Sequence, residues 1–138
     1  MRYYLDTNML YFILSKDDDE VHFSVANLLN DYSSTLYTSS IAIQELLLLY
    51  KIGKFRSRLY KSEQDILATI KLLHINVVFF NERHLNTYTA LQIADGHKDM
   101  NDHAVISQAI SDKIPIISSD AKFSHYTNQG LIFIYNKR

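Results

Sequence analysis

The sequence predicts an α/β fold, a three-layer α/β/α sandwich in which helices cover both faces of a central parallel five-stranded sheet. The first observation is that short apolar segments alternate with longer segments of helical periodicity. The second is that 138 residues contain one proline and three glycines, with no linker or repeat. Because hydrophobic residues make up 47% of the chain, we expect a single domain over residues 1–138 that buries its own core.

The N-terminal part is predicted to contain two strands and three helices. Residues 3–5 form a short strand, and a helix over residues 8–15 follows, with Leu10, Ile13 and Leu14 on its inner face. The acidic run 17–20 is expected as a loop that leads into the first turn of a helix, where negative charge suits the helix dipole. This helix is expected to end near residue 30. Residues 35–38 form a second strand. A serine at position 39 or 40 can then cap a helix that extends to residue 52 and ends at Gly53.

The C-terminal part continues the alternation. A helix over residues 62–74 is expected to turn Ile66, Leu67, Ile70 and Leu73 inward. The remaining predicted elements are a strand at 75–80, helices at 82–94 and 101–111, and strands at 114–117 and 131–135. In such parallel sheets, ligands bind outside the carboxyl ends of the strands, which is where functional residues are sought.

Composition narrows the classes of function. The chain has no cysteine, so disulfides and thiolate metal sites are excluded. No stretch is long and apolar enough to span a membrane, and the N-terminus does not resemble a signal peptide, so a cytoplasmic protein is expected. The net charge of -1 differs from the basic excess of many nucleic-acid binders, although carboxylates that bind a metal would not repel a phosphate backbone.

Carboxylates follow two of the predicted strands. Asp6 comes directly after the first strand, and Asp120 follows the fourth through two serines. Either residue alone can be explained as a cap of a turn or helix. Because both are directed to the same edge of the sheet, they also form a candidate site.

Glu45 is an acidic residue in a helix that is apolar on nearly all sides. We therefore expect that helix to be largely buried, with Glu45 either on a narrow solvent-facing stripe or directed into a site. A buried carboxylate is unfavourable unless it is paired, protonated or bound to a metal.

The segment 97–103 opens a predicted helix and contains two more acids. Asp99 as N-cap and Asp102 at the third helical position would resemble a capping box, which is a purely structural explanation. The functional alternative places Asp102 beside the strand ends, with Asp99 as a further candidate for the same site. His97 and His103 are expected to be surface or turn residues, and neither is proposed as a metal ligand.

A carboxylate set without cysteine or strong histidine candidates is typical of sites for Mg²⁺ or Mn²⁺. Such a site can activate water and stabilise charge on a phosphate. The sequence contains no nucleophilic elbow, phosphate-binding glycine loop or dinucleotide fingerprint. The residues therefore indicate a metal site that acts on a phosphate group through activated water.

These segments resemble the motifs of PIN-domain ribonucleases, in particular the VapC-type toxins of bacterial toxin–antitoxin pairs. Leu5-Asp6-Thr7-Asn8 is similar to the family's Asp-Thr-Asn/Ser signature, and Glu45 lies where the family carries its second acid. The segment 97–102 resembles the His-Arg-Asp-Pro-Phe-Asp form of one branch, and 117–123 is similar to Thr-x-Asp-x-x-Phe. The likeness covers essentially the whole chain. Met100-Asn101 in place of Pro-Phe, Ser118 in place of Thr and His103 in place of Arg question the subfamily more than the activity.

The resemblance implies a PIN-like sheet of order 3-2-1-4-5 and Mg²⁺- or Mn²⁺-dependent cleavage of RNA. It implies that Asp6, Asp102 and Asp120 contact metal directly or through water, and that Glu45 binds metal or orients the attacking water. Asn8 and Ser118 would fix Asp6 by hydrogen bonds. The partners implied are a cognate antitoxin protein and a second copy of the chain in a homodimer.

The segment 51–61 is the most basic part of the chain. It carries Lys51, Lys54, Arg56, Arg58 and Lys61, interleaved with Phe55 and Tyr60, and contains no acid. Such a segment can bind RNA, with basic side chains on phosphates and aromatic rings stacked on bases. A solvated connection between helices is an equal alternative.

Three other functions compete with the ribonuclease. A phosphate-accepting receiver domain needs an aspartate at the end of the third strand, where Asn81 stands. A haloacid-type phosphohydrolase needs Asp-x-Asp after the first strand, and position 8 is asparagine. A catalytically inert PIN-like module that binds RNA or protein is less favoured because all four acids are present.

Overall fold

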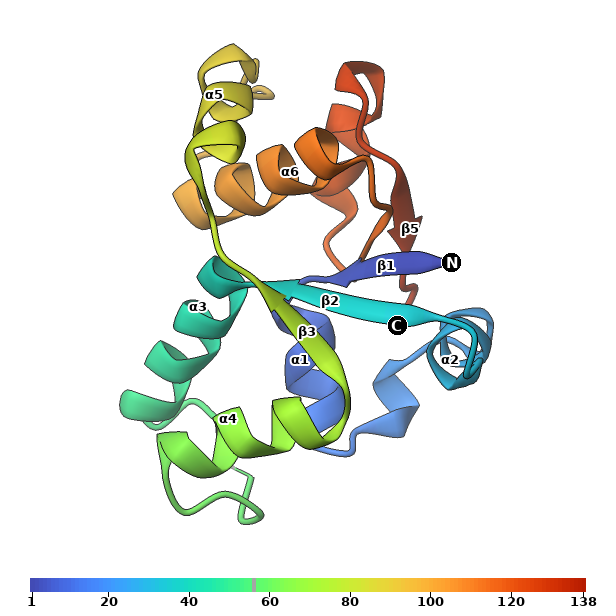
Figure 1. Cartoon of the computed structure of the whole chain (residues 1–138), viewed down its shortest axis with the longest axis vertical. Coiled ribbons are helices and arrows are strands. Elements are labelled where there is room, and N and C mark those ends of the chain that lie inside the picture. The colour runs from blue at the N-terminus through green and yellow to red at the C-terminus, as the bar shows by residue number, and fades with distance from the viewer. Residues whose placement is uncertain (56) are drawn as a thin grey trace.

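The computed structural model describes every residue of the chain except 56 and contains a five-stranded parallel sheet (Figure 1). The strand order is β3-β2-β1-β4-β5, which confirms the predicted order. The strands are β1 Arg2–Leu5, β2 Thr35–Ser39, β3 Ile75–Val78, β4 Ile116–Ser118 and β5 Phe133–Tyr135.

The register aligns the carboxyl ends of the central strands. Leu5 of β1 pairs with Thr38 of β2 on one side and with Ile117 of β4 on the other. The backbone N–H of Asp6 continues this ladder by donating to the carbonyl of Ile117 across 3.1 Å. Asp6 and Ser118 therefore leave neighbouring strands at the same edge of the sheet.

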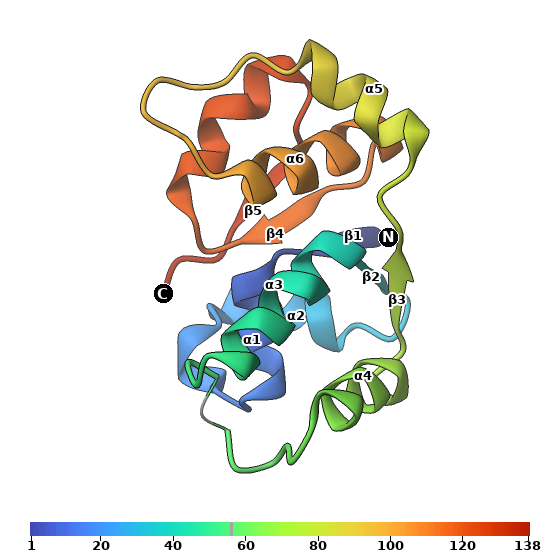
Figure 2. The same cartoon turned by 90° about the vertical axis from the view of Figure 1, so that its left-hand side faces the viewer.

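Helices cover both faces of the sheet, as the α/β pattern predicts. Figures 1 and 2 place α5, α6 and the 3-10 helix η2 on one face, and α1 to α4 on the other. The helices are α1 Thr7–Leu14, η1 Asp18–Glu20, α2 Phe23–Asn30, α3 Ser40–Lys51, α4 Glu63–Leu72, α5 Glu82–Ala90, α6 Met100–Asp112 and η2 Ala121–Gln129. Among the described residues, no helix combines the length and apolar character that crossing a bilayer requires.

The core lies between the sheet and the two helical layers. Leu5, Leu10, Leu46, Ile106 and Ile116 are all fully buried in one continuous cluster of apolar side chains. Removal of this apolar surface from water is the main force that holds the helices against the sheet.

The fourth helix is less buried than its periodicity predicts. Ile66 and Ile70 are buried as expected, whereas Leu67 and Leu73 are 37% and 45% exposed. The helix ends at Leu72, so Leu73 lies beyond its last turn. Because α4 packs beside the edge strand β3, only a narrow stripe of the helix reaches the core.

Several boundaries also differ from the prediction. The helix predicted to residue 94 ends at Ala90, because Leu91 adopts an extended conformation. The acidic run contains a turn of 3-10 helix at Asp18–Glu20 where a loop was expected. The 3-10 helix at Ala121–Gln129 has no counterpart in the prediction, since its apolar residues follow neither a strand nor an α-helical period.

Candidate metal centre

Asp6 lies at the junction of β1 and α1 with its side chain directed into the site. Its backbone carbonyl accepts hydrogen bonds from Met9 and Leu10, but its carboxylate makes no capping hydrogen bond. The carboxylate instead accepts hydrogen bonds from the Ser118 hydroxyl at 2.7 Å and the Asn8 amide at 3.3 Å. The capping explanation therefore fails for Asp6.

Asn8 and Ser118 connect the ends of β1 and β4. The Asn8 side chain donates to the Ser118 hydroxyl at 3.2 Å and accepts from the backbone of Ser119 at 3.1 Å. Ser118 in turn accepts from the backbone N–H of Asp120 at 3.0 Å. Both residues contact Asp6, as the sequence predicts, and they also fix the backbone that carries Asp120.

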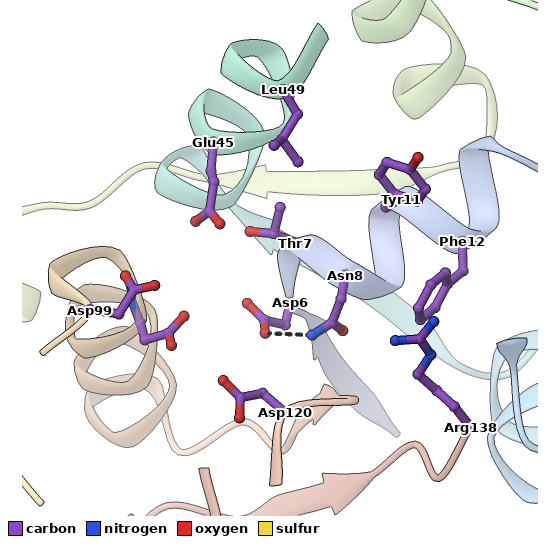
Figure 3. A pocket seen from close by; sticks show the side chains of 11 residues that line it. Asp6, Thr7, Asn8, Tyr11, Phe12, Glu45, Leu49, Asp99, Asp120 and Arg138 are labelled. Atoms are coloured by element: carbon purple, nitrogen blue, oxygen red, sulfur yellow. Dashed lines mark hydrogen bonds between the residues drawn. The ribbon is translucent and has the colours of Figure 1, made fainter. Parts of the chain in front are cut away.

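Asp120 is the N-cap of η2, so the structural explanation accounts for part of its role. Its Oδ1 accepts a hydrogen bond from the backbone of Lys122 at 2.9 Å. The side chain nevertheless lines the same cavity as Asp6 (Figure 3). Capping and a place in the site are therefore compatible for this residue.

Glu45 extends from α3 toward the carboxylates of Asp6 and Asp99 (Figure 3). The helix is less enclosed than its apolar sequence suggested, because Leu48 is 52% exposed and Gln44 also faces solvent. Glu45 itself is partly buried. Of the two alternatives for Glu45, the structure favours a side chain that faces the site.

Asp99 and Asp102 begin α6 and have different surroundings. Asp99 is the N-cap, and its Oδ1 accepts from the backbone of Asn101 and Asp102 at 3.0 and 3.1 Å. Asp102 is the third helical residue, but its side chain contacts His97, with 3.0 Å between Oδ2 and the ring Nε2. The capping alternative is correct for Asp99, while another interaction holds Asp102.

The acidic residues surround one open cavity of about 320 Å³ at the carboxyl edge of the sheet. Its polar lining includes Asp6, Asn8, Glu45, Asp99, Asp102 and Asp120. Among the residues that the structure describes, Arg138 is the cation in this lining. It forms an ion pair with Glu20 and lies 5.1 Å from the ring centre of Phe12. No motif in the sequence indicated that Arg138 would reach the site.

Burial and mutual repulsion raise the pKa values of three of these carboxyl groups. Burial raises the pKa of Asp6 to about 7, and the negative charges of Asp102 and Glu45 contribute to the rise. The hydrogen bond from Ser118 lowers this pKa, but by less than burial raises it. Burial, together with the charges of Asp99, Asp120 and Glu45, raises the pKa of Asp102 to about 7. The pKa of Glu45 is raised by burial and by Asp99. Such a cluster is stabilised by a bound cation.

Both histidines of the segment 97–103 are buried, so the expected surface position is wrong, although the backbone N–H of His97 does close a turn by donating to the carbonyl of Ala94. His97 is 3% exposed and His103 5% exposed, because the loop before α6 folds under the 3-10 helix η2 and packs them against Tyr126. One ligand atom each from His97, Asp102 and Asp120 lies within 4.8 Å of the others. On distance alone, this trio could hold a metal ion.

The basic segment has a different structure from the predicted stacking surface. Phe55 is 4% exposed and packs 5.0 Å from the Tyr11 ring, while the Tyr60 hydroxyl donates to the carbonyl of Leu14. These rings belong to the core and not to a surface that stacks on bases. Lys51 forms an ion pair with Glu63, an acid outside the predicted segment. Lys54, Arg58 and Lys61 are exposed, and Arg56 lies outside the described residues.

Comparison with known structures shows the same fold in three VapBC assemblies. A chain of VapBC2 from Rickettsia felis, bound to a DNA fragment from its promoter, is 21% identical with a TM-score of 0.65; the match covers 99% of this chain and 100% of that one. VapBC-1 from nontypeable Haemophilus influenzae is 21% identical with a TM-score of 0.63, covering 98% of both chains. DNA-bound VapBC from Salmonella typhimurium is 16% identical with a TM-score of 0.65, also covering 98% of both. No curated protein matches the sequence significantly.

A family relationship is shown by the sequence itself. The family model of the PIN domain matches residues 3–129, which include all the carboxylates of the site. The match agrees with the strand order and with the resemblance found in the motifs around Asp6 and Asp120. The chain belongs to the PIN-domain family of nucleases.

Proposed function

We propose that this protein is a divalent-metal-dependent endoribonuclease and the VapC-type toxin of a toxin–antitoxin pair. The observation that carries the proposal is the convergence of Asp6, Glu45, Asp102 and Asp120 on one cavity. These acids come from four separate segments of the chain, and burial without a cation is unfavourable for the charged forms of Asp6 and Asp102.

The donor set fits Mg²⁺ or Mn²⁺. Both ions prefer oxygen ligands, and the cavity offers several carboxylates at the end of a rigid sheet. Asp6, Asp102 and Asp120 would hold the ion, with Glu45 as a further ligand or as the group that orients water. Asp99 would be an additional ligand through Oδ2, since its Oδ1 already accepts two backbone hydrogen bonds.

The cation, when bound, would polarise the phosphate and favour ionisation of a nearby water molecule. Glu45 faces the cavity, so it is placed to orient the attacking water and to accept a proton from it. Ser118 and Asn8 hold the Asp6 carboxylate in one orientation. The water oxygen would form a bond to phosphorus, the bond from phosphorus to one ester oxygen of the RNA backbone would break, and that oxygen would leave as an alcohol after taking a proton from solvent.

RNA and two protein partners complete the proposal. Exposed Lys54, Arg58 and Lys61 would contact the RNA backbone electrostatically, with Lys51 and Arg56 as the other basic residues of the segment. The VapBC assemblies that share the fold support a cognate antitoxin as partner. A homodimer is proposed from the family resemblance.

The proposal is tested by incubating the purified protein with structured RNAs in Mg²⁺, Mn²⁺ or EDTA. We expect cleavage only with metal and its loss in Asp6→Asn, whereas Asp95→Asn, which alters an exposed acid outside the cavity lining, should cleave normally. Cleavage that survives both EDTA and Asp6→Asn would contradict the proposal. Carboxylate-dependent Mn²⁺ binding without cleavage would favour an inert PIN-like module.

A further inference from the structure

Three polar side chains form a hydrogen-bonded series that ends at the Asp102 carboxylate. Tyr126 of η2 contacts His97 in the loop before α6, and His97 contacts Asp102. We propose that His97 is a positioning residue that donates its Nε2 hydrogen to Asp102 and aims that carboxylate at the metal site, without being a metal ligand. The inference rests on the proposed function insofar as Asp102 is taken as a metal ligand.

The hydrogen bonds of Tyr126 determine which ring nitrogen of His97 carries hydrogen. The Tyr126 oxygen accepts a hydrogen bond from the backbone N–H of Ala94 at 3.1 Å. Its hydroxyl hydrogen is therefore directed to its other partner, Nδ1 of His97 at 2.7 Å. Since Nδ1 then acts as an acceptor, the hydrogen of the neutral ring is on Nε2, which faces Oδ2 of Asp102 at 3.0 Å.

The imidazole ring of His97 is held from several directions. Its 3% exposure and the complete burial of Tyr126 leave little freedom for rotation. The His103 ring lies 4.8 Å away in an edge-on contact, and its Nε2 contacts the His97 carbonyl at 2.9 Å. A donor fixed in this way restricts Asp102 to one rotamer, which reduces the conformational entropy lost on metal binding.

The short distances within the trio of His97, Asp102 and Asp120 also suggest the opposite role, in which the imidazole binds the ion. A metal-binding nitrogen needs a free lone pair, and Nε2 has none while it carries hydrogen. Moving the hydrogen to Nδ1 would leave the buried hydroxyl hydrogen of Tyr126 without its acceptor. The network therefore favours a position for His97 in which the ring contacts the proposed metal ligand Asp102 and does not bind the ion.

The tautomer can be measured in the metal-free protein by NMR with ¹⁵N-labelled histidine at pH 8. The His97 signal is assigned by its loss in His97→Gln. From the hydrogen bonds of Tyr126 we expect hydrogen on Nε2 and a bare Nδ1. A ring with hydrogen on Nδ1, or on both nitrogens, would overturn the proposal. This readout needs neither metal nor activity, so it decides the hydrogen bond even if the proposed ribonuclease fails.

The positioning role is tested by Mn²⁺ affinity, measured by isothermal titration. His97→Phe removes the donor but keeps a ring, and we expect it to weaken Mn²⁺ binding about 10- to 100-fold. His97→Gln places an amide N–H near the position of Nε2 and should restore affinity to within about threefold. His125→Gln changes an exposed histidine of the same 3-10 helix and serves as the matched control, with unchanged affinity expected.

Two results would overturn the positioning role: wild-type affinity in His97→Phe, or equal weakness in His97→Gln and His97→Phe. If His97→Phe fails to fold, as a melting curve would show, the Gln variant and Tyr126→Phe decide the matter. Tyr126→Phe removes only the hydroxyl that fixes Nδ1, so weaker Mn²⁺ binding is expected there, and unchanged binding counts against the proposal. Absence of Mn²⁺ binding in the wild type would contradict the proposed metal site and, with it, the positioning role.

Discussion

The hydroxyl of Ser118 donates a hydrogen bond to Oδ2 of Asp6 across 2.7 Å, although the two residues are 112 positions apart. The contact exists because β1 and β4 are adjacent parallel strands whose carboxyl ends coincide. Ser118 also accepts the backbone N–H of Asp120. One hydroxyl therefore fixes the Asp6 carboxylate and the backbone that carries Asp120, two residues that we place in the metal site.

Ser118 is accordingly predicted to matter for activity through its hydroxyl group. Ser118→Ala removes the donor to Asp6 and should lower kcat/KM for RNA about 10- to 100-fold. Ser118→Thr retains the hydroxyl and is the matched control, with activity expected within a few fold of wild type. Single-turnover cleavage with Mn²⁺ measures both variants. Wild-type activity in Ser118→Ala would show that this hydrogen bond does not hold Asp6 for the reaction.

The stability of the metal-free protein is predicted to fall as pH rises. The pKa values of Asp6 and Asp102 are about 7 in the folded protein, above the 3.8 of the unfolded chain. Between these values the folded state binds more protons than the unfolded state, so the free energy of unfolding decreases from about pH 4 to about pH 7. Urea unfolding in EDTA across this range measures the effect.

A control variant separates Asp6 from other titrating groups. The side chain of Asn in Asp6→Asn cannot ionise, so the stability of this variant should decline less with pH and should exceed that of the metal-free wild type at pH 8. Mn²⁺ should raise the melting temperature of the wild type more at pH 8 than at pH 5, because protons compete with the ion. An identical pH profile in both proteins would refute the raised pKa of Asp6.

RNA affinity is predicted to depend on the exposed cations of the basic segment. The double variant Lys54→Ala/Arg58→Ala should raise KM for RNA. It should also make the slope of log affinity against log salt concentration shallower by about 1.4, because each lost phosphate contact to single-stranded RNA contributes about 0.7 to that slope. Lys71→Ala, an exposed lysine on α4, should leave the slope unchanged. Salt titrations of RNA binding in EDTA compare the three proteins. An unchanged slope in the double variant would assign the segment to a solvated connection.

Phe55 is predicted to affect folding and not base stacking. Its ring is buried between Tyr11 and Tyr60, so Phe55→Ala should lower the free energy of unfolding by about 3 kcal/mol. Phe55→Leu preserves most of the apolar volume and should cost less. Urea denaturation measures both. Unaltered stability together with weakened RNA binding in Phe55→Ala would instead restore the stacking role.

The sheet order was predicted from the resemblance to PIN-domain ribonucleases. The meeting of Asp6 and Asp120 at one edge could be predicted independently, because the carboxyl ends of parallel strands lie at the same edge of a sheet. Exposure on α4 could not be predicted, because Leu67 and Leu73 fit the helical period equally well. Their exposure depends on how far the edge strand β3 extends beneath the helix, which is a tertiary feature.

The surroundings of the site were harder to predict than its acids. The burial of His97 depends on Tyr126 in a 3-10 helix that no periodic pattern indicates. Arg138 lines the cavity although it follows β5 and belongs to no motif. Glu63 neutralises Lys51 only after the chain turns back at the start of α4. These contacts join distant segments, so local patterns carry no signal for them.

The central claim is that Asp6, Asp102 and Asp120 bind a divalent cation at the carboxyl edge of the sheet. The most direct test is anomalous X-ray scattering from crystals of the protein soaked in Mn²⁺. We predict an anomalous peak in the cavity with carboxylate oxygens of these residues at about 2.2 Å, and no such peak in crystals of Asp6→Asn. A cavity without manganese in well-diffracting wild-type crystals, or a peak confined to another site, would contradict the account.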